Sequence, residues 1–500
     1  MKRLIITAIG MLCLTSPGIS QDIQPFGYYI DALRFSQTAL GGTTRIQSMG
    51  GVQVGLGGDL SSALSNPAGL GFYNRSDVSV SSSMNLQSAT TDYLGTSSSN
   101  SKNKFAVAQL GVALQSNPDH ESKFLSGTFA ITLTRINDFN SNYSIAGTNN
   151  ETSIIDSFLS QAEGQNTNQF GGNDLVSLAY DNYFIGPKNI LTPPGADNEY
   201  FTDVTGIPFQ EDHIQTAGKQ QQWSISYGGN FNDKFYFGFG LGIISLDYQS
   251  ERIYRESFSV DPLSSTQLIE TLKIDGTGVN GTIGVIYRPV NEFRLGASII
   301  TPTLYGIEDT YDATMNGFWN NFLYEDAIDG DTLLIYTYAE TDILISNYTL
   351  TTPMKLNGGI SYFFKKNGFV SFDVTYSDHT KTNMKTDDFS MSDDNQAIKN
   401  LAKSTLNIKI GGEYRINKLM LRAGYANIQN NYETDEAIYN GGNVYSGGIG
   451  YRINSFYVDA GVVYSQYKQE YSPYYVPGST PIANVGSNNT RILLTIGSNF

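Results

Sequence analysis

The sequence has little charge, a single cysteine and no long apolar run. Asp, Glu, Lys and Arg make up 16% of the 500 residues, against the roughly 25% that is typical of soluble domains. No stretch reaches the about 18 uninterrupted apolar residues that mark a transmembrane helix, so we expect no helical span. The one cysteine, Cys13, lies in the N-terminal segment. The rest of the chain therefore has no cysteine for a disulfide, a thiolate metal site or a nucleophile.

The first 20 residues have the pattern of a secretory signal peptide. Lys2 and Arg3 precede an apolar stretch at residues 4–14, and small residues follow at 18–20. An apolar stretch of about 11 residues is too short to span a bilayer as a helix. We predict that residues 1–20 are removed on export.

Histidine, tryptophan and basic residues are also scarce. The formal net charge is −16, which argues against nucleic acid as a partner, because nucleic-acid binding relies on Lys and Arg. The three histidines, His120, His213 and His379, are far apart, so we expect no metal and no cofactor. Tyr and Gly are abundant instead, with 33 and 51 residues. This composition fits a membrane β-barrel with aromatic girdles, and equally a soluble, secreted all-β protein.

From about Asp77 to the end, apolar and polar or small residues alternate with a period of two. In residues 235–243, for example, Phe and aliphatic residues alternate with Tyr and Gly. Such alternation is typical of half-buried strands. The pattern predicts fourteen strands, at residues 76–88, 104–115, 123–136, 220–231, 234–249, 273–288, 292–302, 353–365, 368–380, 402–415, 418–428, 442–453, 455–467 and 489–500.

The connections between these segments alternate between short and long. The short ones are 117–122, 232–233, 289–291, 366–367, 416–417 and Asn454, and the long ones are 89–103, 137–219, 250–272, 303–352, 381–401, 429–441 and 468–488. Outer-membrane barrels have tight periplasmic turns and long external loops, whereas a soluble sandwich gives no reason for this asymmetry. The sequence therefore predicts an all-β, fourteen-stranded antiparallel transmembrane β-barrel over residues 76–500. Both termini would be periplasmic, and 137–219 and 303–352 would be the longest external loops.

Residues 21–75 precede the first strand, and 39–74 are too rich in Gly, Ser and Ala to form a core of their own. We predict that this segment is a hatch, a plug that folds inside the barrel. Side chains fill the interior of a barrel of about eight strands, and about sixteen strands leave an open aqueous channel. A fourteen-stranded barrel is intermediate, so we expect it to leak without a plug. Asp59 is expected to cap a helix over residues 60–65, and Pro67 to end it at Asn66. Gly69 permits a close-packed exit from the turn.

The stretch GDLSSALSNPAGLGF resembles the hatch of the FadL/TodX-type outer-membrane transporters of hydrophobic compounds. The triplet Asn66, Pro67 and Ala68 matches an Asn-Pro-Ala triplet of that hatch, and residues 39–41 are similar to the family's N-terminal pattern. The resemblance implies capture of a hydrophobic, fatty-acid-like ligand at the external loops and binding in the barrel interior. It also implies a hatch rearrangement, lateral release through the barrel wall and no catalysis.

Two groups of residues are candidates for ligand and plug contacts. An aromatic cluster in the 303–352 loop is either a capture surface or packing against the barrel rim, and its members are Phe318, Trp319, Phe322, Leu323 and Tyr324. Charged residues on the inward face either pair with each other and with the plug or line a wet lumen. These are Arg294, Asp373, Lys409, Glu413, Arg415, Arg422, Asp459 and Arg491.

Passive uptake is the leading function, and two alternatives stay open. One is a non-transporting barrel of the same family that serves protein secretion, such as a type IX surface-protein shuttle. The other is an outer-membrane lipase, for which no Ser/His pair is visible, so we expect no enzyme. The final strand ends in Phe500 and resembles the signal read by the bacterial barrel-assembly machinery. Outer-membrane lipid and lipopolysaccharide are the other expected partners, in the outer membrane of a Gram-negative bacterium.

Overall fold

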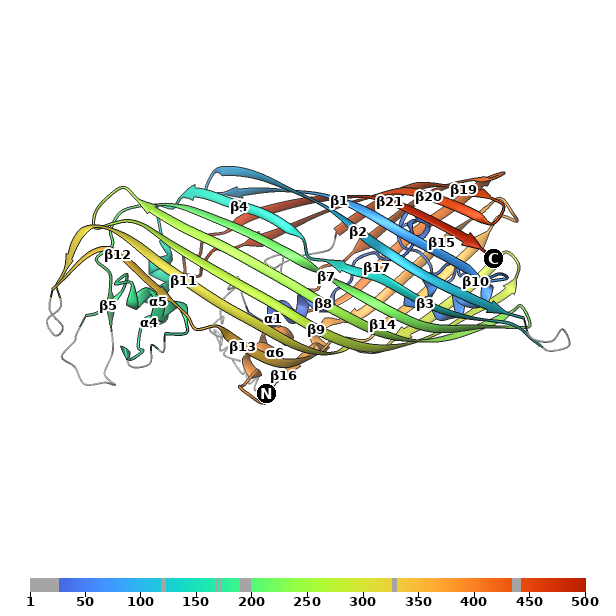
Figure 1. The fold of residues 1–500 in the computed structure, drawn as a ribbon, viewed down its shortest axis with the longest axis horizontal. Coiled ribbons are helices and arrows are strands. Elements are labelled where there is room, and N and C mark those ends of the chain that lie inside the picture. Colours follow the sequence, from blue (N-terminus) through green and yellow to red (C-terminus); the bar gives the residue numbers. More distant parts are fainter. Residues whose placement is uncertain are drawn as a thin grey trace, which may run out of the picture.

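The computed structural model is a closed antiparallel barrel (Figure 1). It describes residues 27–117, 123–167, 170, 172–188, 199–325, 331–433 and 442–500, and the predicted signal peptide lies outside them. The 14 barrel strands are β1 (Asp77–Tyr93), β2 (Thr96–Ser116), β3 (Phe124–Asp138), β7 (Pro208–Phe231), β8 (Phe235–Phe258), β9 (Leu263–Val290), β10 (Phe293–Ile300), β14 (Lys355–Phe363), β15 (Gly368–Asp378), β17 (Ser404–Ile416), β18 (Leu419–Ile428), β19 (Gly442–Ile453), β20 (Phe456–Tyr471) and β21 (Ala483–Asn499). Each pairs with the next, and β21 closes the barrel on β1, from Asn499 opposite Asp77 to Asn484 opposite Asp92. The predicted fold class is confirmed.

The outer face of the barrel is apolar and the inner face is small or polar. On β8, Phe237, Phe239 and Leu241 are 41–59% exposed, while Gly238 and Gly240 face the lumen. Exposed aromatic residues gather where the strands meet the short turns, namely Phe231, Phe235, Tyr287, Tyr362, Phe364, Tyr414, Tyr451, Phe456 and Phe500. An apolar belt with an aromatic girdle is the surface that a barrel presents to lipid.

The strands run well past the predicted ends on the side of the long connections. β1 and β2 are joined by two residues, Leu94 and Gly95, and β8 and β9 by only four. The predicted long loops at 89–103 and 250–272 are therefore wrong, because strand pairing continues through most of both. Beyond the apolar belt the outer face meets water, so Ser and Thr replace apolar residues and the alternation disappears although the ladder continues.

The two longest connections, 303–352 and 137–219, contain regular structure as well. The 303–352 connection forms β11 (Leu304–Tyr324), β12 (Thr332–Glu340) and β13 (Leu344–Thr351), and β11 pairs along β9. The 137–219 connection forms β4 (Ser141–Thr148), α4 (Ile154–Ala162), α5 (Leu175–Asp181), β5 (Gly186–Pro187) and β6 (Tyr200–Phe201). Figure 1 shows α4, α5 and β12 at the end of the molecule opposite the C-terminus. We call that end the cap end, and the long connections that lie there are together called the cap. The end with the short connections is called the turn end.

Residues 27–75 form the plug, which lies inside the barrel (Figure 1). It contains α1 (Tyr28–Ser36), α2 (Thr44–Gln47), α3 (Ser62–Ser65) and the 3-10 helix η1 (Pro67–Phe72). Residues 39–75 are called the plug base below. The long connection between β15 and β17 forms η3 (His379–Lys381), β16 (Asn383–Lys385) and α6 (Ser392–Leu401). Within the described residues, no helix is long and apolar enough to cross a membrane.

The short helix of the plug differs from the prediction at its start and agrees with it at its end. α3 begins at Ser62 rather than at residue 60, and its N-cap Ser61 makes no side-chain cap. The Asp59 carboxylate instead accepts hydrogen bonds from the Ser61 N–H and the Thr43 hydroxyl, both at 3.0 Å. These partners outside the helix hold the carboxylate away from the first turn. The helix ends at Asn66, in an extended conformation before the proline, as predicted.

Candidate ligand pocket and plug

The plug base lies directly against a row of lumen-facing glycines in the barrel wall. A Cβ added at Gly411 or Gly424 would come within 2.1 Å of the Met49 backbone, and one at Gly296 within 2.1 Å of the Val54 oxygen. Nine strand glycines have a plug atom closer than 3.0 Å to such a Cβ, namely Gly228, Gly238, Gly284, Gly296, Gly359, Gly411, Gly424, Gly448 and Gly461. Any side chain at these sites would push the plug away, so the wall provides a seat that only glycine permits.

The Asn66-Pro67-Ala68 triplet is a turn that contacts the wall at β8 and β9. The Asn66 amide donates to the Val54 oxygen at 2.7 Å and to the Val285 oxygen of β9 at 3.3 Å. Its carbonyl accepts from the Ala68 N–H at 3.2 Å. Gly69 packs against Ser62, where a Cβ would lie 2.5 Å from the hydroxyl. One buried amide thus ties the turn both to the plug and to the barrel.

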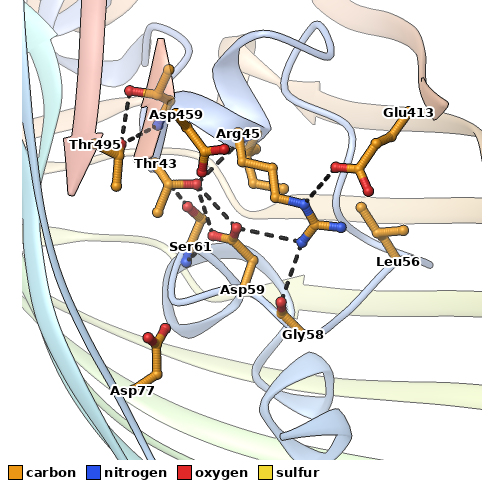
Figure 2. A network of polar contacts seen from close by, with 12 residues as sticks. Thr43, Arg45, Leu56, Gly58, Asp59, Ser61, Asp77, Glu413, Asp459 and Thr495 are labelled. Carbon is orange, nitrogen blue, oxygen red and sulfur yellow. Dashed lines mark hydrogen bonds and ion pairs between the residues drawn. The ribbon is translucent and has the colours of Figure 1, made fainter. Parts of the chain in front are cut away.

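A buried network of charges joins the plug base to β17, β18 and β20. In Figure 2, Arg45 lies between Glu413 of the wall and Asp59 of the plug, at 3.1 Å and 3.6 Å. Glu413 also accepts hydrogen bonds from Arg422 and Arg415, both at 2.8 Å. Arg422 continues to Asp459 on β20, at 2.6 Å. Four of the eight predicted lumen charges therefore belong to one network that includes the plug.

The other predicted lumen charges also contact the plug or face it. The Asp373 carboxylate of β15 accepts hydrogen bonds from the Gln53 and Val54 N–H groups, at 2.6 Å and 2.8 Å. Lys409 is paired opposite Asp373 in the β15–β17 ladder, on the same inner face. Arg491 of β21 donates to a plug carbonyl at 2.9 Å.

Arg294 of β10 holds the plug base in a different way. Its guanidinium donates to the Leu56 carbonyl and lies between two aromatic rings, 3.9 Å from the centroid of Phe72 and 4.2 Å from that of Phe363. Phe72 belongs to the plug and Phe363 to the wall, so one cation stacks the two together.

By contrast, α1 is held by side chains, several of which come from the cap connections. Asn431 donates to the Leu33 carbonyl at 3.0 Å, and the Asp394 carboxylate of α6 accepts from the Tyr29 N–H at 3.3 Å. The Ser36 hydroxyl lies 3.0 Å from Nδ1 of His379. Burial, and then the positive charge of Lys355, lower the pKa of His379 to about 3. This imidazole is therefore neutral at physiological pH.

The predicted capture cluster is divided between two faces of β11. Trp319, which is 4% exposed, lies 5.8 Å from the ring of Phe184 and 5.7 Å from that of Phe322, inside the cap. Tyr324 packs against another cap tyrosine at 4.9 Å. Phe318 and Leu323 are exposed on the other face. The five residues therefore do not form one continuous surface.

A large cavity lies between α1 and the cap, and the sequence does not predict it. Its volume is about 370 Å3, and α1, α4, α5, β8, β9, β11 and β13 all contribute to its walls. The apolar part of the lining is formed by Ile154, Phe158, Val176, Leu268, Leu272 and Leu344. These residues are far apart in the sequence, so only the fold brings them together. One local signal was available, the capping box of Ser153 and Asp156 that begins α4.

Two smaller cavities lie toward the other end of α1. Gly27, Tyr28 and Asp31 line the large pocket, whereas Phe35 and Ser36 line a second cavity of about 130 Å3. A third, of about 110 Å3, shares Ala39, Leu40, Ile136 and Ile428 with the second. The three cavities thus form a series, in which α1 runs from the first to the second and shared residues join the second to the third.

The third cavity lies beside a break in the barrel wall. The β2–β3 ladder runs only from Gln109 opposite Thr134 to Ser116 opposite Gly127. Beyond it, β2 pairs with β1, and β4 pairs with β7. Side chains cross the break, as where Lys104 donates to Asn140 at 2.8 Å. The cavity is lined from both sides, because it includes Lys102, Lys104 and Ala108 of β2 and residues 135–138 of β3.

Nothing in this arrangement suggests a metal centre. Among the described residues, no three His, Cys, Asp or Glu side chains are grouped so that they could hold a metal ion.

Comparisons with solved structures identify the fold. No protein-family model and no curated protein matches the chain. A FadL homologue from Pseudomonas aeruginosa superimposes with a TM-score of 0.55 and 11% identity, covering 93% of this chain and 99% of that one. The toluene transporters TodX of P. putida and TbuX of Ralstonia pickettii give TM-scores of 0.52 and 0.50 at 13% and 15% identity, each covering 92% of this chain and 99% of the other. The fold is therefore that of the FadL/TodX-type transporters, as the resemblance predicted.

Proposed function

We propose that the protein is a passive channel for hydrophobic or amphipathic small molecules in the outer membrane of a Gram-negative bacterium. The observation that carries this proposal is the series of three cavities, which begins in the cap and ends beside the break between β2 and β3. The apolar belt supports a place in lipid. The names of the similar structures, a FadL homologue and two toluene transporters, agree with such cargo.

In the proposed route, the ligand enters the 370 Å3 pocket from the cap end, which faces the outside. It then passes α1, occupies the smaller cavities and leaves through the break in the wall. α1 is the gate in this proposal, because its beginning lines the pocket, its end lines the second cavity, and side chains of the cap hold it. A ligand that rearranges α6 therefore changes the contacts of α1 directly.

The chain ends complete the proposed orientation. The termini belong to the periplasmic side, and Phe500 is 64% exposed while its N–H donates to the Ser76 oxygen at 2.9 Å. An exposed terminal aromatic residue on a paired last strand suits recognition by the barrel-assembly machinery. The turn-end girdle and the outer rim are the expected contacts with outer-membrane lipid and lipopolysaccharide.

The proposal is tested by binding to the purified protein in a non-ionic detergent, with N-phenyl-1-naphthylamine as a neutral hydrophobic probe. We expect saturable binding that Ser157→Trp abolishes, because Ser157 is buried and lines the large pocket. The matched control is Ser160→Trp on the same helix, where the side chain is exposed. Saturable binding that both variants leave unchanged would contradict the proposed site. No saturable binding of the probe to the wild-type protein would contradict uptake and favour the secretion role.

A further inference from the structure

The large pocket has an acidic side that hydrophobic cargo alone does not explain. Four carboxylates line it, Asp31 of α1, Asp174 at the N-cap of α5, Glu270 of β9 and Asp309 of β11. Among the described lining residues the only cation is Arg252 of β8. The polar part of the pocket therefore has an excess of negative charge.

The positive charge of Arg252 is already matched by the protein. Its guanidinium is 2% exposed and donates to Asp212 at 2.9 Å, to Glu270 at 2.6 Å and to the Pro473 carbonyl at 2.5 Å. Two carboxylates thus pair with one guanidinium. An anionic head group that approached Arg252 would have to replace one of them inside a buried site.

The second nearby cation is matched in the same way. Arg34 of α1 forms an ion pair with Asp31, and its guanidinium lies 4.6 Å from the ring centroid of Tyr248. It does not line the pocket.

Asp309 is different, because it forms no ion pair among the described residues although it is only 6% exposed. Burial, and then the negative charge of Asp31, raise the pKa of Asp309 to about 6. Close by, the hydroxyl of Tyr348 is buried without a hydrogen-bond partner in the described part of the chain. Tyr348 follows the lining residue Ser346 by two positions on β13, so the two share a face of the strand. The Asp309 carboxylate accepts hydrogen bonds from the hydroxyl and the N–H of Ser346, but no cation among the described residues balances its charge, and the Tyr348 oxygen close to it has no donor.

We propose that this pocket selects amphiphiles with a cationic amine head over those with a carboxylate head. The inference rests on the proposed function and names the class of its cargo. The ammonium would pair with Asp309 and donate to Tyr348, while the alkyl chain would lie along the apolar lining. A charge-assisted pair of this kind is stronger than a neutral hydrogen bond. A carboxylate would meet like charges in a desolvated site. The proposed ligand keeps the fatty-acid-like alkyl chain that the sequence predicts and has an amine head group in place of the carboxylate.

The test is competition at pH 8 against bound N-phenyl-1-naphthylamine, with the full chain in a non-ionic detergent. Dodecylamine, dodecanol and dodecanoate have the same chain and differ in head group. We expect dodecylamine to displace the probe at a concentration about tenfold lower than dodecanoate, or about 1.4 kcal/mol in affinity, with dodecanol between them. Asp309→Asn should reduce this ratio to about one. The matched control is Glu308→Gln, because Glu308 is the next residue on β11 and is exposed; it should keep the tenfold ratio.

The outcomes separate the two proposals. If the probe binds saturably and the three competitors are equal, or dodecanoate is the strongest, the amine preference is wrong while the channel stands. If the amine is preferred equally by wild type and Asp309→Asn, the assignment to Asp309 is wrong. If the wild-type protein binds no probe saturably, both proposals fail. Heat-modifiable migration on a gel verifies that each variant has a folded barrel.

Discussion

The two parts of the plug are attached to the protein in different ways. The plug base has its backbone against wall glycines and exchanges hydrogen bonds and ion pairs with the strands. α1 is attached through apolar side chains such as Leu33 and Phe35, and through polar side chains of the cap connections. Where two backbones are packed directly against each other, neither can move without a steric clash. Side chains, by contrast, can change rotamer and exchange one contact for another. We therefore expect sealing and gating to belong to different segments of the plug.

The largest effect is expected where the seat of the plug base is filled. Gly424→Val would place a Cβ about 2.1 Å from the Met49 backbone and prevent the base from docking. We expect planar-bilayer conductance to rise from near zero to that of an open pore, while the barrel stays heat-modifiable on a gel.

The matched control for that variant is Gly447→Val. Gly447 lies on the adjacent strand β19, and an added Cβ meets nothing closer than 3.6 Å. It should leave the conductance unchanged. If both variants conduct equally, the glycine seat does not hold the plug.

A smaller leak is expected from Asp373→Ala. The change removes the acceptor of the Gln53 and Val54 N–H groups, and hydrogen bonds to a charged group contribute about 1.5–3 kcal/mol each. We expect intermittent openings in single-channel recordings rather than a permanent pore. Asp275→Ala, which removes a carboxylate that is half exposed on β9, is the control. A closed channel in Asp373→Ala would show that the base is held by other contacts.

The comparison predicts a different result for α1. Phe35→Ala removes a ring that packs against Phe139 and Tyr248, at a local cost of about 3 kcal/mol. We expect faster passage of the hydrophobic probe into liposomes with little change in ion conductance, because the base stays seated. Conductance as high as in Gly424→Val would mean that α1, and not the base, seals the lumen.

The smallest effect is expected for Asn66→Ala in the triplet. It removes the hydrogen bonds to Val54 and Val285, which contribute about 1 kcal/mol each. Conductance should rise slightly above that of the wild type. A fully open pore in this variant would make the triplet the main attachment of the base, against the view that many contacts share this role.

The sequence predicted the parts of this structure that repeat and missed those that depend on distant segments. Period-two alternation located all fourteen barrel strands because lipid imposes an apolar outer face. The alternation ends at the edge of that apolar face, so the pattern predicts loops where β1, β2, β8 and β9 in fact extend. Gly238, Gly240 and Gly242 indicated small lumen-facing residues, but not the plug atoms they contact. The pocket is formed by α1, α4 and β11, which are far apart in the sequence. Nothing in the sequence around Asp309 distinguishes it from a solvent-exposed acid.

The most direct test of the account is hydrogen exchange of the backbone amides, followed by mass spectrometry with and without the hydrophobic probe. Peptides from residues 43–75 should stay protected in both states, because they are seated against the wall. Peptides from residues 27–38 should exchange faster and change their protection when the probe binds. If the two segments exchange at the same rate and respond together, the plug moves as one body and the division between seal and gate is wrong.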